Sequence, residues 1–197
     1  MIQNVKRSLN SAIQYTAIAG AIACTDAKAD FHAYDLTAGN NAPQVRLLDT
    51  MQFGKLTFEG FNQGTKDWYF GDNAIFYSQK PSAVIQPMAK FFATQDGFSH
   101  VVPGVRFAVG NATLDAGYYN SGLHMKAMGG TQVNCFGGGF GLYLTQIVNA
   151  APRQKPYSLS EIEVSKMFAK HAGLVGRVSW ENFSGKPKIE GGVRYAY

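Results

Sequence analysis

The sequence contains little cysteine and no long apolar run. Its two cysteines are Cys24 and Cys135. If the first 29 residues are removed, only Cys135 remains, so an intrachain disulfide and a CxxC redox or metal motif are excluded. No apolar stretch reaches the roughly 20 residues that a membrane-spanning helix needs. Helical membrane proteins and disulfide scaffolds are therefore excluded.

Charge of one sign is also scarce. The net charge of +5 falls to +3 for residues 30–197, which hold 15 basic and 12 acidic side chains. This net charge is too small, and the basic residues are too evenly spread along the chain, to indicate a nucleic-acid-binding surface. No nucleic-acid partner is therefore expected.

Glycine and aromatic residues are abundant. The chain has 22 glycines, aromatic residues make up 13% of it, and its mean hydropathy is −0.13. This composition suits a β-barrel whose strands show one face to lipid and the other to a polar interior. It suits a secreted β-sandwich equally, so composition alone does not decide.

The N-terminus has the three parts of a secretory signal peptide. Lys6 and Arg7 form a basic start, residues 12–23 form a modest apolar run, and Ala27-Lys28-Ala29 is a small-x-small cleavage site. The sequence predicts export, cleavage of residues 1–29, and one domain over residues 30–197.

Two other interpretations of this region stay open. Ala21-Ile22-Ala23-Cys24 loosely resembles a lipoprotein lipobox, with Ala21 where leucine is usual. That interpretation gives a lipoprotein anchored through Cys24, whereas an uncleaved amphipathic helix would stay on the chain.

The last stretch, residues 187–197, alternates with a period of two. Ile189, Val193, Tyr195 and Tyr197 fall on one face, and the opposite face carries charged side chains. Such alternation predicts a β-strand with one apolar and one polar face. A soluble β domain could end in an edge strand of this kind, but chain termini in soluble proteins are usually polar.

This ending resembles the C-terminal signature of bacterial outer-membrane β-barrel proteins, with Tyr197 as the terminal aromatic residue. The resemblance extends over the whole order of signal peptide, alternating strands and final tyrosine. It implies location in the bacterial outer membrane and contact with outer-membrane lipid. It also implies recognition of strand 187–197 by the barrel-assembly machinery.

Turn signals divide residues 30–197 into short strands. Residues 45–53 and 56–61 form a hairpin around Gly54-Lys55, and residues 105–109 and 113–119 form another around Gly110-Asn111. Eight to eleven segments result, and bacterial barrels have even strand numbers. We therefore predict an all-β, antiparallel, up-and-down transmembrane β-barrel of 8–10 strands, with ten preferred.

Several segments in this assignment of strands raise further questions, and some have two interpretations. Gly71-Asp72-Asn73 is a turn or a bulge within one strand, and Gly129-Gly130 is predicted to be a turn. Pro87 predicts a kink or broken pairing. Residues 159–169 fit a helix or a strand, and their alternation favours a strand.

A second resemblance concerns the nucleoside-specific channel family. It rests on residues 56–61, 67–70 and 84–91, which are strand-like fragments in a chain shorter than that family's usual size. It implies nucleosides as solutes.

The more polar face of each strand supplies the candidate interior side chains. They are Arg46, Glu59, Arg106, Asp115, Glu161, Glu163, Arg177, Glu181, Lys188, Glu190 and Arg194. Charges of both signs allow two hypotheses. Paired charges would plug a narrow barrel with a structural or adhesive role, whereas a wider barrel would be a narrow passive pore for small polar solutes.

Aromatic residues are candidates for the girdles at the two membrane interfaces. They are Trp68, Tyr69, Tyr118, Trp180, Tyr195 and Tyr197. Packing in a soluble core is the alternative role for the same side chains.

Signals for catalysis are weak. The four histidines have no metal-ligand spacing, GxSxG is absent, and no cofactor motif occurs. Ser99-His100 and Ser121 with His124 leave an outer-membrane lipid-modifying hydrolase as an alternative. A soluble periplasmic ligand-binding β-barrel is the other. We predict no enzyme, no metal site and no cofactor.

Overall fold

The computed structural model describes residues 28–40, 43–65, 67–78, 84–94, 97–119, 122–135, 138–150, 152 and 155–196. Within these ranges the chain forms twelve strands. They are β1 (Lys28–Gly39), β2 (Gln44–Phe53), β3 (Leu56–Gly64), β4 (Tyr69–Tyr77), β5 (Ile85–Thr94), β6 (Gly97–Val109), β7 (Ala112–Tyr119), β8 (Gly122–Cys135), β9 (Gly138–Ala150), β10 (Tyr157–Met167), β11 (Ala172–Glu181) and β12 (Lys188–Ala196).

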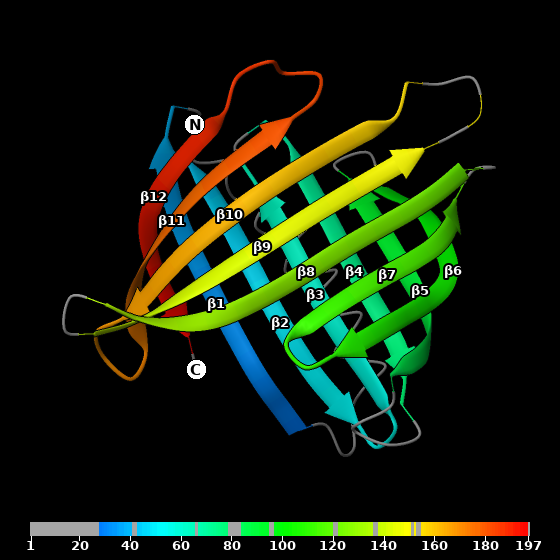
Figure 1. Ribbon diagram of the computed structural model, residues 1–197, viewed down its shortest axis with the longest axis horizontal. Helices are drawn as coiled ribbons and strands as arrows, with labels where there is room; N and C mark the ends of the chain where they lie inside the picture. The colour runs from blue at the N-terminus through cyan, green and yellow to red at the C-terminus, as the bar shows by residue number, and fades with distance from the viewer. Residues whose placement is uncertain are drawn as a thin grey trace.

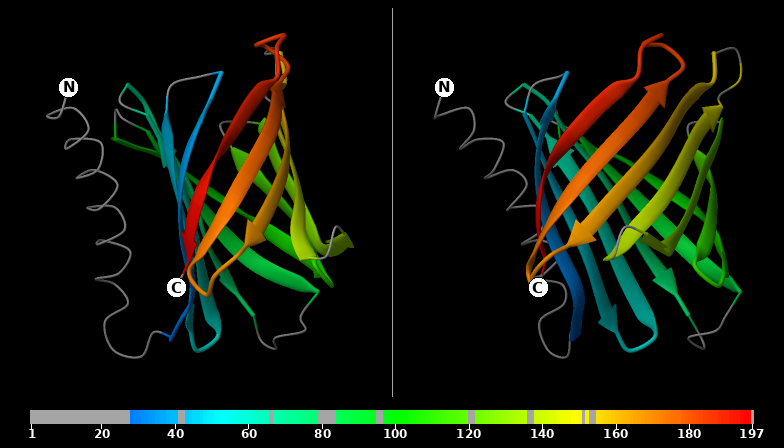
Figure 2. Two further views of the ribbon diagram at one scale, coloured as in Figure 1. Left: turned by 90° about the vertical axis from the view of Figure 1, so that its left-hand side faces the viewer. Right: turned by 60° about the vertical axis from the view of Figure 1, so that its left-hand side comes forward.

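The sheet closes on itself. Each strand pairs antiparallel with its neighbours in sequence, and β1 pairs with β12 from Ala33–Ala196 to Gly39–Glu190. The strands are steeply tilted around the barrel (Figure 1), and Figure 2 shows the tilted strands of the closed sheet from two other sides. The predicted all-β, antiparallel, up-and-down barrel is confirmed.

The predicted signal peptide lies almost wholly outside the described residues, as does Cys24. Lys28 and Ala29, at the predicted cleavage site, begin β1 and pair with Gln52 and Met51 of β2. Cleavage after Ala29 stays a prediction.

The predicted strand number was wrong, because the described residues contain twelve strands rather than eight to ten. One strand that the prediction did not include is β8. Gly129-Gly130, predicted to be a turn, lies inside β8 and pairs with Leu144 and Tyr143 of β9. Gly71-Asp72-Asn73 lies in the middle of β4, which pairs in a continuous register.

Position 130 is glycine because of side-chain packing and not because the chain turns there. A Cβ atom there would lie 2.3 Å from Cδ1 of the Tyr143 ring. The ring therefore needs a neighbour without a side chain, and glycine in a strand often marks such a close approach.

Both predicted tight hairpins are confirmed. Phe53 pairs with Leu56 and Val109 pairs with Ala112, so two residues connect each pair of strands. Gly54 and Gly110 have φ angles of 60° and 57°, which glycine adopts at no steric cost.

Pro87 lies inside β5 and does not end the strand, and of the two predicted effects, a kink or broken pairing, the second fits on one side. It pairs with Val105 of β6, and the described pairing of β5 with β4 ends one residue away, at Phe76 and Met88. On that side, the missing N–H of proline breaks no described ladder bond. The strand interpretation of residues 159–169 is confirmed by β10.

The two faces of the barrel differ in polarity. Outward side chains such as Leu36, Phe107, Leu144, Ile162 and Val193 are exposed, and many buried side chains are charged or polar. This arrangement reverses that of a soluble domain and matches a barrel with lipid outside and a polar interior. No helix in the described part of the chain is long and apolar enough to cross a membrane.

One region of the outer face is polar. His32 and Asp49 lie 2.6 Å apart, Tyr69 donates to Asn62 at 2.6 Å, and Asn62 donates to Asn73 at 3.2 Å. The register places these side chains of β1 to β4 opposite the inward face. Hydrogen bonding among them lowers the cost of polar groups there.

Candidate functional site

The candidate site is the barrel interior. Cross-strand partners share a face, so the register assigns inward positions strand by strand from pairs such as Asp35–Arg46, Arg106–Asp115 and Arg177–Glu190. The predicted interior residues all fall on this face: Arg46, Glu59, Arg106, Asp115, Glu161, Glu163, Arg177, Glu181, Lys188, Glu190 and Arg194.

The interior also contains ionisable side chains that sequence reasoning missed. They are Asp35, Asp72, Lys90, His124 and Lys126. Asp72 lies in the segment 71–73, which was predicted to be a turn or a bulge, and His124 and Lys126 lie on the unrecognised strand β8. The alternation of His124, Lys126 and Met128 with Leu123, Met125 and Ala127 could have identified that strand.

Two groups of ion pairs fill the middle of the interior. The first, called the arginine cluster, consists of Asp35, Arg46, Glu161, Glu163, Arg177 and Arg194. Arg194 binds Asp35 at 2.7 Å and Glu163 at 2.7 Å. Arg177 also binds both carboxylates, with 2.8 Å to Glu163. Asp35 is thus shared by two guanidinium groups, and Glu163 by three, because Arg46 also lies 3.8 Å from it.

The second group, called the lysine cluster, consists of Glu59, Asp72, Lys90, Arg106, Asp115 and Lys126. Lys90 and Lys126 lie 3.0 Å and 2.8 Å from the carboxylate of Asp72. Arg106 binds Asp115 at 2.6 Å and Glu59 at 2.8 Å. Basic and acidic side chains are balanced in each cluster.

Some of these pairs extend across the interior. Arg46 of β2 binds Glu161 of β10 at 2.8 Å, although β1, β12 and β11 separate the two strands in the closed order. Lys126 of β8 reaches Asp72 of β4 in the same way, past β7, β6 and β5. The clusters therefore narrow the barrel at mid-height.

Burial makes the pairing necessary. Asp35, Arg177, Lys90 and Asp115 are each less than 3% exposed, and an unpaired ion in such surroundings costs several kcal/mol. Phenylalanine rings add contacts: the guanidinium of Arg106 lies 4.2 Å from the centre of the Phe76 ring.

His124 belongs to the edge of the lysine cluster. Its ring nitrogens lie 3.2 Å from Lys90 Nζ and 2.5 Å from Asn149 Oδ1, and its ring packs edge-on against Phe92. The partners found for this histidine are therefore a lysine and an amide. Its serine neighbour in the hydrolase alternative, Ser121, lies outside the described residues, as do the side chains of Ser99 and His100.

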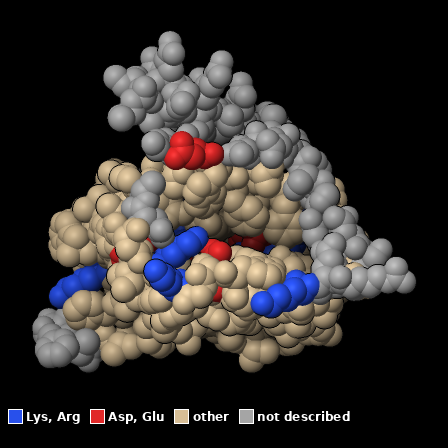
Figure 3. Space-filling model, turned by 90° about the horizontal axis from the view of Figure 1, so that it is seen from above, with Lys and Arg blue, Asp and Glu red and all other residues tan. Residues whose placement is uncertain are grey.

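Above the clusters lies a cavity of about 660 Å³. Arg46, Asp72, His124 and Glu161 lie at its inner end, two or more residues inside their strands. We call this cavity the vestibule. Figure 3 looks into its mouth and shows acidic and basic side chains inside the opening. Its full lining is Gln44, Arg46, Gln63, Thr65, Asp67, Trp68, Phe70, Asp72, Phe92, Thr94, His124, Ile147, Asn149, Tyr157, Leu159, Glu161, Ser179, Glu181, Lys188 and Glu190.

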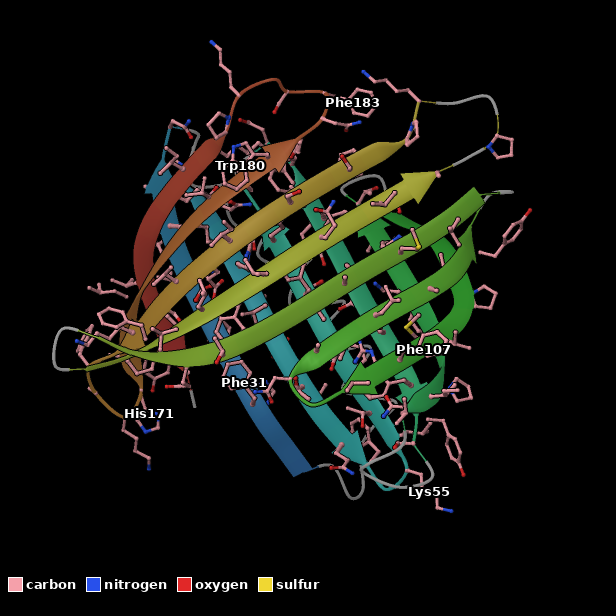
Figure 4. All side chains as sticks on the ribbon, in the orientation of Figure 1. Phe31, Lys55, Phe107, His171, Trp180 and Phe183 are labelled. Atoms are coloured by element: carbon pink, nitrogen blue, oxygen red, sulfur yellow. The ribbon has the colours of Figure 1, made fainter. Side chains whose placement is uncertain are left out.

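The predicted girdle aromatics lie in different places. Tyr118, Trp180 and Tyr195 are exposed on the outer face. Trp180 lies at the mouth end (Figure 4), whereas Tyr195 lies at the opposite end beside His171, with ring centres 5.9 Å apart. Tyr118 pairs with Leu123 beside the connection from β7 to β8, which is at the mouth end. Trp68 lines the vestibule.

Two predicted girdle residues do not lie on an exposed outer face. Tyr69 is buried and donates to Asn62. Tyr197 lies outside the described residues.

Metal ligands do not gather in the described part of the chain. No group of three or more histidine, cysteine, aspartate or glutamate side chains there has the geometry to hold an ion. The carboxylates are instead engaged by arginine and lysine.

Comparison with known proteins concerns the fold. The chain matches no protein-family model and none of the curated proteins compared with it. Among solved structures it is similar to "KdgM porin", with a TM-score of 0.59 and 13% identity over 85% of this chain and 99% of that chain. Its fold is that of a porin barrel. It is also similar to "KdgM porin in complex with disordered oligogalacturonate", with a TM-score of 0.56 and 12% identity over 86% of this chain and 99% of that chain.

Proposed function

We propose that the chain is a porin-like β-barrel of the bacterial outer membrane that acts as a narrow passive pore for small polar solutes. One observation carries the proposal: a closed barrel with an apolar outside contains a vestibule of about 660 Å³ whose lining combines charged and polar side chains with aromatic ones. The similarity to KdgM porin, which shares this fold, supports it.

The same proposal includes an orientation. The two-residue turns at 54–55 and 110–111 and the C-terminal end of β12 lie at one end of the barrel, together with the connections at 78–84 and 168–171. The connections at 151–156 and 182–187 lie at the other end. Outer-membrane barrels place short turns in the periplasm and long loops outside. The vestibule would then open to the exterior, and strand 187–197 would meet the barrel-assembly machinery.

A plugged barrel with a structural or adhesive role is the second candidate. The ion pairs that cross the interior, from Arg46 to Glu161 and from Lys126 to Asp72, favour it because they occupy the middle of the barrel. Liposome swelling separates the two candidates. If the barrel is an open pore, proteoliposomes should swell in small sugars, and the swelling rate should fall as the solute becomes larger. If the barrel is plugged, the protein would insert but the vesicles would swell no faster than vesicles without protein.

Nucleosides are a narrower proposal for the solute. Trp68, Phe70, Phe92 and Tyr157 line the vestibule together with the amides of Gln63 and Asn149. Aromatic rings can stack on a base, and amides can bond its edge. Nucleosides added on the vestibule side should then reduce ion current through the inserted protein, and the corresponding free pentoses should not.

A further inference from the structure

Charge is balanced within the barrel except at the vestibule. In the arginine cluster Arg46, Arg177 and Arg194 bind Asp35, Glu161 and Glu163, and the lysine cluster has equal numbers of both signs. At the mouth, Glu181 and Lys188 form their own pair at 2.8 Å.

Glu190 is the interior carboxylate outside these balanced groups. It lies on the inward face of β12, opposite Arg177 of β11 and Gly39 of β1, and lines the vestibule. No ion pair among the described residues includes it. With its amide turned so that nitrogen faces the carboxylate, Gln44 donates to Glu190 Oε1 at 2.5 Å. The guanidinium of Arg177, at the facing position of β11, also attracts Glu190 but is already bound to Asp35 and Glu163, so the charges around it keep one negative charge in excess.

The rest of the lining strengthens this imbalance. Among the described residues, the cations of the lining are Arg46 and Lys188, and each is already bound to a carboxylate, Arg46 to Glu161 and Lys188 to Glu181. Lys155 and Lys186 are exposed on the connections above the mouth and do not line the cavity. The Lys155 ammonium instead lies 5.2 Å from the centre of the Phe183 ring.

We infer that the vestibule selects cations over anions and that Glu190 is the residue that determines this selectivity. A ring or wall of carboxylates lowers the energy of a cation in a narrow water-filled path and raises that of an anion. The solutes favoured are small inorganic cations and protonated amines, and polyanionic sugar chains are disfavoured. This inference rests on the proposed pore function.

The test is the reversal potential of the inserted protein in a planar bilayer under a KCl gradient. Wild-type protein should pass K⁺ in preference to Cl⁻. Glu190→Gln should bring the permeability ratio severalfold closer to one, and Glu190→Asp, which keeps the charge, should preserve the wild-type preference.

Two matched controls isolate the charge of Glu190. Lys155→Gln removes an exposed cation of the connection 151–156 that does not line the cavity, so the ratio should stay as in the wild type. Lys186→Gln removes a loop cation outside the lining, and it should also leave the ratio unchanged.

The outcomes separate this inference from the proposed function. Conducting protein that prefers Cl⁻, or a Glu190→Gln variant with the wild-type ratio, would overturn the selectivity inference and leave the pore intact. Inserted protein that passes no ions at all would overturn both.

Discussion

At the scale of single residues, the interior depends on arginines that hold two carboxylates at once. Arg177 and Arg194 both bind Asp35 and Glu163, so removing one of these guanidinium groups leaves Asp35 with a single partner and takes one of three partners from Glu163. Such a loss is expensive because the remaining charge cannot reach water.

Arg177→Met should therefore lower the free energy of unfolding by about 3–5 kcal/mol, measured by urea titration in lipid vesicles. Lys188→Gln is the control, because its pair with Glu181 is partly exposed at the mouth and should contribute less than about 1 kcal/mol. Equal small losses in both variants would contradict a structural role for the arginine cluster.

At the scale of elements, β8 and β9 show what the sequence could and could not predict. Hairpins at 54–55 and 110–111 follow from glycine and from alternation in adjacent residues, which is local information. Gly129-Gly130 resembles these turns in sequence, yet Gly130 is required because the Tyr143 ring of the neighbouring strand lies against it. Nothing near position 130 in the sequence specifies that contact.

Gly130→Ala should reduce stability by about 1–3 kcal/mol, because the new Cβ would overlap the Tyr143 ring. Gly191→Ala on β12 is the matched control, since its added Cβ meets nothing within 4 Å, and it should change stability by less than about 0.5 kcal/mol. Unfolding titrations of both variants test this. The penalty of Gly130→Ala should largely disappear in a Tyr143→Ala background, and persistence there would point to a different cause.

The outer face of β10 offers a test of membrane depth. Ile162 lies at the middle of the strand and Ser158 near its mouth end, both on the outward face. Ile162→Arg should cost about 2–4 kcal/mol in lipid, and Ser158→Arg about 0–1 kcal/mol, because lipid penalises arginine most at the midplane. Folding titrations in vesicles measure both. Equal tolerance of the two arginines would contradict a lipid-facing β10.

At the scale of the whole molecule, the alternation of polar and apolar residues predicts which side chains face the interior better than it predicts the number of strands. The inward position of residues such as Arg46 and Arg194 follows from period-two reading alone. Which charges pair does not follow, since Arg46 meets Glu161 only because the sheet closes and brings β2 toward β10. The vestibule and the position of Trp68 in it depend on the same closure.

The most direct test of the pore proposal is single-channel conductance after confirmed insertion into a planar bilayer. A water-filled path past the two clusters predicts discrete, reproducible current steps. Protein that is demonstrably inserted and folded but electrically silent would contradict the pore and favour a barrel plugged by its own ion pairs.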